Sequence, residues 1–174
     1  DGSVVDSPSD RDHLGRAIWA VGCYANSSLY GEPAWSRRSL ETALQWGLGT
    51  VSPRAKAYFL LGTSEFLKAE PNPRLAEAAS RLAQHLIDWY RGVCRPDWRW
   101  FEEMLTYDNA RLSESLAAYY ETTQDSVSLN VACESLEFLV NAQTVEGVFA
   151  PIGNKRWYRV GGPKALYDQQ PVDA

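Results

Sequence analysis

The chain has 174 residues, of which 45% are hydrophobic and 22% are charged, and its formal net charge is −5. The composition is that of an ordinary globular protein, and the chain is long enough to bury a hydrophobic core. The negative net charge gives no sign of a basic surface for binding nucleic acid. No apolar run approaches the roughly 18 residues that a membrane-spanning helix needs, so we predict no membrane partner.

The N-terminal half of the sequence predicts helices that differ in how much of their surface is apolar. Residues 1–10 are polar and are predicted to be mobile. A helix over residues 12–27 has apolar side chains nearly all round, so we expect it to be buried on most sides. A second helix over residues 35–48 is one-sided. Ser52-Pro53 starts a third, nearly all-round apolar helix, with serine as N-cap and proline in the first turn.

The rest of the chain continues the helical pattern. Asn72-Pro73 starts a fourth helix with a clear 3.6-residue period. Asp108 is placed to N-cap a fifth helix, and a sixth begins at Asp125 or Ser126. No stretch alternates convincingly with a period of two. We therefore predict an all-α fold without a large sheet.

The helices alternate between a buried and a one-sided character. The first, third and fifth look buried, and the second, fourth and sixth look one-sided, which is what two concentric layers of helices would produce. A further helix start closes the chain at residues 167–174. The N-termini of inner helices would lie on one rim, where backbone N–H groups and positive dipole ends point. The residues expected at that opening are Asp12, Arg16, Arg54, Asp108, Arg111 and Asp168.

The stretch Asp97–Leu112, D-W-R-W-F-E-E-M-L-T-Y-D-N-A-R-L, is unusually aromatic for a loop between two helices. It places flat apolar faces beside carboxylates, a combination that suits the C–H faces and hydroxyl rim of a sugar. The alternative is that the aromatic side chains plug a helix end while Arg99 or Arg111 neutralises the acids. Both interpretations remain open at the level of sequence.

A long loop over residues 147–170 follows the sixth helix, and its glycines and proline predict a shaped segment. Trp157 and Tyr158 give it aromatic surface. It is predicted either to form a wall or lid over the opening or to pack as a long loop anchored by these aromatics. The Gly161-Gly162 pair is a weak phosphate signal, because it follows no strand.

Four segments carry a family resemblance: D-H-L-G-R-A-I-W-A-V-G, W-R-W-F-E-E-M-L-T-Y-D-N-A-R-L, F-A-P-I-G-N-K-R-W-Y and Y-D-Q-Q-P-V-D-A. Together, over roughly residues 10–174, they resemble a bacterial family with the six-hairpin, (α/α)6-toroid glycosidase-like fold, often encoded or annotated together with glycosyltransferases. The resemblance implies a toroid with a carbohydrate-sized funnel. The chain supplies three inner–outer pairs and the beginning of a seventh helix, so it is expected to be one toroid-like domain (residues 11–174) of a longer protein.

Two classes of function are predicted. The first is glycoside hydrolysis, which needs one carboxylic acid and one carboxylate. Glu102 or Glu103, among aromatic side chains that would raise its pKa, is expected to be the acid, and Asp168 the base. Asp108 is the remaining carboxylate candidate. Sugar epimerisation is a weaker variant, because it calls for histidine bases and only His13 lies at the rim.

The second class is a non-catalytic module for sugar binding or assembly. For either class, the residues expected to contact an oligosaccharide are Asp12, His13, Arg16, Arg54, Trp98, Trp100, Tyr107, Asn109, Arg111, Asn154, Trp157, Gln169 and Gln170. Three hairpins form an arc whose apolar edges need covering, so we also expect pairing with another copy or with a missing portion of the protein.

The cysteines and histidines indicate which cellular compartment and which cofactors to expect. Cys23, Cys94 and Cys133 are odd in number and widely spaced, which favours buried thiols in a reducing compartment such as the cytoplasm over a disulfide framework. His13 and His85 are the only histidines, and no metal-ligand spacing occurs. The sequence predicts no metal and no cofactor.

Overall fold

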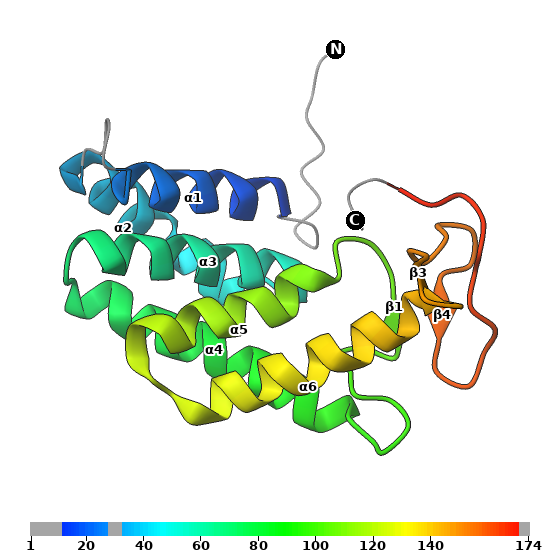
Figure 1. The fold of residues 1–174 in the computed structure, drawn as a ribbon. Coiled ribbons are helices and arrows are strands. Elements are labelled where there is room, and N and C mark those ends of the chain that lie inside the picture. The colour runs from blue at the N-terminus through cyan, green and yellow to red at the C-terminus, as the bar shows by residue number, and fades with distance from the viewer. Residues whose placement is uncertain (1–11, 28–32, 171–174) are drawn as a thin grey trace, which may run out of the picture. The chain divides into compact units, whose positions relative to one another are not determined.

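The computed structural model describes residues 12–27 and 33–170, and within them it is mostly helical (Figure 1). The chain forms two compact units, residues 1–82 and 83–174, which are described here each by itself. The helices are α1 (Asp12–Ala25), α2 (Pro33–Gly49), α3 (Pro53–Ala69), α4 (Pro73–Val93), α5 (Ala110–Thr123) and α6 (Ser126–Ala142). The strands are β1 (Met104–Leu105), β2 (Thr144–Val145), β3 (Val148–Phe149) and β4 (Tyr158–Arg159). The all-α prediction is confirmed.

Three helices begin at the polar capping residues that the sequence predicted. The Ser52 hydroxyl accepts a hydrogen bond from the Ala55 amide at 3.2 Å, at the start of α3. The Asn72 side chain accepts from the Leu75 amide at 3.1 Å, at the start of α4. Asp125 accepts from two amides in the first turn of α6. Each cap satisfies an N–H that has no partner within its own helix.

The start of α5 differs from the prediction. Asn109, not Asp108, is the residue before the helix, and its side chain makes no cap hydrogen bond. Instead, the Asn109 amide closes a local turn, donating to the Thr106 carbonyl at 2.8 Å and accepting from the Thr106 amide at 3.1 Å. Asp108, one residue earlier, has a φ of 48°, in the left-handed region. The prediction that Asp108 is the N-cap was wrong, because Asn109 occupies that position.

In the first unit, α1 and α3 approach so closely that glycine is required between them. A Cβ on Gly22 would lie 2.0 Å from the Gly62 carbonyl oxygen, and one on Gly62 would lie 2.5 Å from the Ile18 carbonyl oxygen. Twelve of the seventeen α3 residues are buried, as the sequence predicted. The prediction for α1 was wrong, because α1 buries a single stripe rather than most of its surface. That stripe is Asp12, Gly15, Ile18, Gly22 and Ala25.

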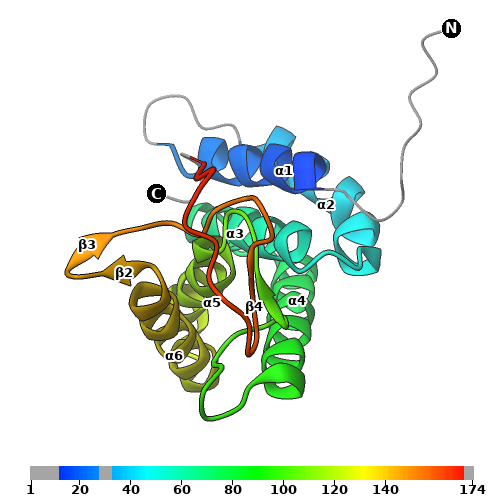
Figure 2. The same cartoon turned by 90° about the vertical axis from the view of Figure 1, so that its right-hand side faces the viewer.

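In the second unit, α5 and α6 lie side by side, with the Ser113 and Ser135 hydroxyls 2.8 Å apart in their contact (Figure 1). The short strands β1 and β4 pair antiparallel, with Leu105 opposite Tyr158. Figure 1 shows β4 and the long C-terminal loop beyond the end of α6, and in the view of Figure 2 they lie in front of α5. This pairing joins the aromatic stretch after α4 to the loop after α6, two segments about fifty residues apart in the sequence.

Some predictions reach beyond what the structure describes. Residues 1–10 lie outside the described ranges, as do residues 171–174. Residues 167–170 are not helical, so no seventh helix begins within the described part of the expected segment. The single toroid-like domain and its rim stay predictions. No helix within the described ranges combines the length and the apolar character that crossing a membrane would require.

Candidate functional site

The second unit has an open groove of about 470 Å³ around Trp157, lined also by Arg156, Arg159, Gly162 and Pro163. Trp157 is half-buried, whereas both arginines are exposed. Trp157 was predicted from the sequence as a ligand contact, whereas Arg156 and Arg159 were not. The signal was present in the run R-W-Y-R, which places a cation on either side of two aromatic rings.

Backbone geometry shapes the loop that carries Trp157. Arg156 and Trp157 have φ angles of 83° and 54°, in the left-handed region that non-glycine residues rarely adopt. The Trp157 carbonyl accepts a hydrogen bond from the Ala165 amide at 3.1 Å, and the Arg159 carbonyl accepts from the Gly162 amide at 2.9 Å. These bonds close the loop on itself and hold the groove residues in place.

Further hydrogen bonds hold the loop together and attach it to α6. The Gly153 amide donates to the Ala165 carbonyl at 2.8 Å, and the Asn154 amide donates to the Asp168 carbonyl at 2.9 Å. Lys164 donates to the Ala142 carbonyl at the end of α6, and burial lowers the pKa of its amine. Lys164 therefore anchors the loop to α6.

Tyr107 brings the aromatic stretch to the groove. Its ring centroid lies 6.4 Å from that of Trp157, with the two planes at 44°. The Val160 amide also donates to the Glu103 carbonyl at 3.0 Å, which extends the pairing of β1 with β4. The structure thus brings together two of the predicted ligand contacts, Tyr107 and Trp157, from the two segments singled out in the sequence.

The structure places Trp98 and Trp100 in a packed cluster. Trp98 is 2% exposed and Trp100 is fully buried. The Trp98 ring meets Phe138 of α6 and Tyr158 of β4, both at 5.1 Å between centroids, and Trp100 contacts Phe101 at 5.3 Å. The expectation of an open sugar platform at these two indoles is corrected, because aromatic neighbours already occupy their faces.

Of the two predicted acids, Glu103 lacks the apolar environment expected for it. The Glu103 side chain is 72% exposed and forms an ion pair with Arg95 at 3.3 Å. Glu102 is half-buried, and its carbonyl accepts a hydrogen bond from the Trp98 indole at 2.7 Å. The Trp98 indole therefore bonds to the main chain of this segment, and the Glu103 carboxylate pairs with a cation.

Asp108 is buried and paired with a cation. Its carboxylate lies 3.4 Å from Arg111, which also forms an ion pair with Glu114. The neutralisation of acids by Arg111 was one of the two interpretations drawn from the sequence, and the structure contains that pair. Asn109 is also buried and uses both ends of its amide on the Thr106 backbone.

The remaining predicted residues of the second unit lie in the C-terminal loop. Asp168 is exposed, with a φ of 63°, and Asn154 is half-buried. The exposed Gln169 side chain donates to the Pro151 carbonyl at 2.9 Å, and Gln170 is half-buried. Their backbone bonds run along the loop, and none of the four lines the Trp157 groove.

In the first unit, the starts of α1 and α3 meet as the sequence predicted. The Ser52 hydroxyl donates to the buried Asp12 carboxylate at 2.8 Å. Arg16 donates to the Tyr58 hydroxyl at 3.1 Å and lies over its ring. Arg54 is buried and His13 is exposed. These contacts of Asp12 and Arg16 join α1 to α3.

A second cavity in the second unit was missed from the sequence. It measures about 290 Å³ and is lined by Pro96, Asp97, Arg99, Glu134, Glu137, Phe138 and Asn141. The Tyr90 hydroxyl donates to Glu134 at 2.7 Å, and burial, followed by hydrogen bonding to Cys94 and Glu134, raises the pKa of Tyr90. The available signal was the spacing of Glu134, Glu137 and Asn141 along one face of α6.

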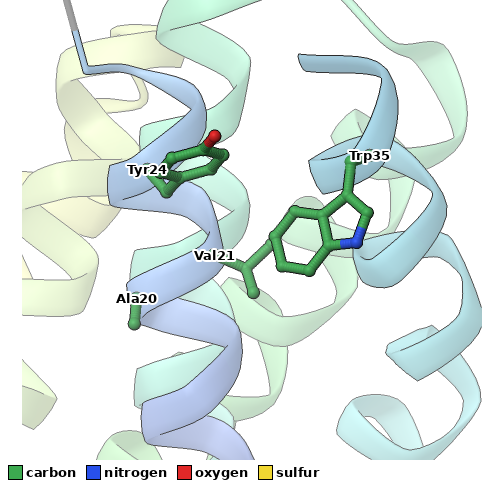
Figure 3. Close-up of a pocket in the computed structure, with 4 residues that line it drawn as sticks. All are labelled: Ala20, Val21, Tyr24 and Trp35. Carbon is green, nitrogen blue, oxygen red and sulfur yellow. The ribbon is translucent and has the colours of Figure 1, made fainter. Parts of the chain in front are cut away.

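An apolar pocket of about 410 Å³ lies between α1 and α2 in the first unit (Figure 3). Tyr24 and Trp35 meet edge to face there, with 5.9 Å between centroids. Both side chains are exposed, at 39% and 46%. The predicted pairing with another copy or with a missing portion of the protein stays a prediction.

The cysteines differ from their prediction in burial. None of the three forms a disulfide, but Cys23 and Cys133 are exposed and Cys94 is half-buried. Cys23 and Cys133 lie at exposed positions of α1 and α6, and Cys94 follows the end of α4. Among the described residues, no group of three or more histidine, cysteine or carboxylate side chains is placed to hold a metal ion.

Comparison of the chain with protein families, with curated proteins and with solved structures finds no match.

Proposed function

We propose that the second unit binds a carbohydrate in the Trp157 groove and that the chain acts as a sugar-binding module. The observation that carries this proposal is a half-buried tryptophan in an open groove of about 470 Å³, flanked by two exposed guanidinium groups. Ligand sites typically occupy about 300–1,000 Å³, so the groove has room for one or two sugar rings.

The chemistry of the lining suits a sugar. The indole of Trp157 offers a flat apolar surface for the C–H face of a ring, and each guanidinium has five N–H donors for hydroxyl oxygens. The closed loop and the left-handed backbone at Trp157 hold the indole in position before a ligand arrives, which lowers the entropic cost of binding. The resemblance to glycosidase-like toroids supports the same class of ligand.

Calorimetric titration of the full chain with a panel of mono- and oligosaccharides tests the proposal. We expect at least one sugar to bind, and Trp157→Ala to weaken its Kd by about tenfold, equivalent to about 1.4 kcal/mol. The matched control is Trp46→Ala, because Trp46 is a half-exposed tryptophan in the first unit. Unchanged binding in Trp157→Ala, or no binding to any sugar, would overturn the proposal.

Glycoside hydrolysis is the second candidate, and the cavity beside α6 favours it. Asp97, Glu134 and Glu137 line that cavity together with Arg99 and the Phe138 ring. The reaction requires two carboxyl groups flanking the bond that breaks. These carboxylates share a cavity, unlike Glu103, which is paired with Arg95 on the surface.

A turnover assay on aryl glycosides tests this second candidate. If Glu134 or Glu137 is the general acid, its replacement by glutamine should lower kcat by about 10²–10⁴-fold. Glu103→Gln, at an exposed position, is the matched control and should leave turnover unchanged. Normal turnover in both cavity variants would exclude this cavity as the catalytic site.

A further inference from the structure

We propose that the Trp157 groove selects anionic saccharides, sugars that carry a carboxylate or a phosphate, over neutral ones. This inference rests on the proposed sugar-binding function and names its ligand class. It is carried by the side chains that line the groove, which supply two guanidinium groups and no carboxylate among the described residues.

The two arginines are available to a ligand. Arg156 and Arg159 are exposed, and neither belongs to an ion pair within residues 12–27 and 33–170. The carboxylate nearest to them along the β1–β4 pairing is Glu103, whose backbone carbonyl bonds to Val160. The Glu103 side chain instead pairs with Arg95, so it does not neutralise the groove.

This local charge runs against the chain as a whole, whose net charge is −5. Two cations that line one groove repel each other, and a bound anion removes that repulsion. Guanidinium groups also match the planar carboxylate and the phosphate group with paired hydrogen bonds, which a neutral hydroxyl cannot form. A sugar acid on the Trp157 ring would therefore gain a charge-assisted contact that a neutral sugar lacks.

The neighbouring lysines do not play the same part. Lys164 donates to the Ala142 carbonyl at 2.8 Å and is held against α6. Lys155 is exposed but does not line the groove. The selectivity should therefore depend on Arg156 and Arg159 specifically, rather than on general positive charge in the loop.

The test is titration of the full chain with matched ligand pairs: glucuronate against glucose, and glucose 6-phosphate against glucose. We expect at least one acidic sugar to bind about tenfold or more tightly than its neutral partner, and the preference to shrink with added salt. The pair that shows the preference identifies carboxylate or phosphate as the anion. Inorganic phosphate and acetate, which have no sugar ring, should bind more weakly than the acidic sugars.

Variants separate this inference from the proposed function. The double variant Arg156→Gln with Arg159→Gln should lose the acidic preference, because its affinity for the acidic sugar falls much further than its affinity for glucose. Lys155→Gln should keep the preference. Trp157→Ala should weaken both members of each pair. Equal binding of acidic and neutral sugars overturns the inference and leaves the proposed function standing.

Three other results also overturn the inference. Survival of the preference in the double arginine variant would place the anion elsewhere. Binding of inorganic phosphate as tightly as glucose 6-phosphate would indicate an anion site without sugar recognition. Absence of binding to every sugar overturns the inference together with the proposed function.

Discussion

Two segments of the second unit combine tryptophan with arginine: W-R-W at residues 98–100 and R-W-Y-R at residues 156–159. The first pair of tryptophans is buried in an aromatic cluster, whereas Trp157 lines an open groove. The composition of the two segments is similar, and their neighbours differ. Phe138 and Tyr158 pack on Trp98, while Trp157 has Tyr107 on one side and arginines around an open space.

The difference shows what each tryptophan contributes. A buried indole stabilises the fold through the area it removes from water, and its loss leaves a cavity. A half-exposed indole in a preformed loop contributes little to folding and leaves a face for a ligand. The stretch that first suggested a sugar platform is therefore the scaffold, and the later loop carries the open aromatic surface.

The largest expected effect is on stability, from truncation in the cluster. Trp100→Ala should lower the free energy of unfolding by about 3–5 kcal/mol, the range for large aromatic residues in cores. Trp157→Ala should cost about 1 kcal/mol or less, as for a substitution near the surface. Denaturant unfolding followed by circular dichroism measures both. Similar losses in the two variants would contradict the distinction drawn here.

An intermediate effect is expected where the backbone, rather than a side chain, shapes the groove. A Cβ on Gly153 would lie 2.0 Å from the Tyr167 carbonyl oxygen, so Gly153→Ala forces apart the two segments of the loop that contain these residues. We expect a loss of about 1–3 kcal/mol, typical of overpacking, and a shift of the Trp157 indole N–H signal in NMR spectra.

The control for this substitution is Gly92→Ala. A Cβ at Gly92 meets nothing within 4 Å, and the residue lies within α4, so alanine there should be neutral or stabilising. An unshifted Trp157 signal in Gly153→Ala would show that this close approach does not shape the groove.

The smallest expected effect concerns the cap of α6, the helix that carries Phe138 into the cluster. Hydrogen bonds from the Ser128 hydroxyl, and then from the Ser128 and Val127 amides, lower the pKa of Asp125 below its ordinary value of 3.8. Because the folded-state pKa is depressed, the charged cap contributes stability above pH 3.8 and loses it as the pH falls through the folded-state pKa. Asp125→Ala should cost about 1 kcal/mol at neutral pH.

The matched variant is Asp125→Asn, which caps nearly as well but does not titrate. At pH 7 the unfolding curves of the wild type and Asp125→Ala should differ, and the difference should disappear as the pH falls below 3.8 and through the folded-state pKa, while Asp125→Asn keeps its cap across the range. Neither variant should change ligand binding at Trp157. A constant difference between wild type and Asp125→Ala in acid would contradict the assigned cause.

The helices were predictable because their signals are local. Three helix starts are marked by capping residues whose contacts lie within three residues along the chain: Ser52 with Pro53, Asn72 with Pro73, and Asp125. Signals this local can be located in the sequence. The N-cap of α5 was placed one residue too early, at Asp108, whereas Asn109 precedes the helix and bonds to the Thr106 backbone. A helical pattern does not distinguish between two adjacent polar residues that are both common at helix starts.

The candidate site was predictable only in part. The sequence identified both segments and the residues Tyr107 and Trp157, but not the arginines or the cavity beside α6. By itself, the sequence determined the all-α class, the capped helix starts at Ser52, Asn72 and Asp125, and the presence of two aromatic segments, because those depend on neighbours in the chain. Only the tertiary structure decided which tryptophans are buried, because Phe138 and Tyr158 reach Trp98 from 40 and 60 residues away.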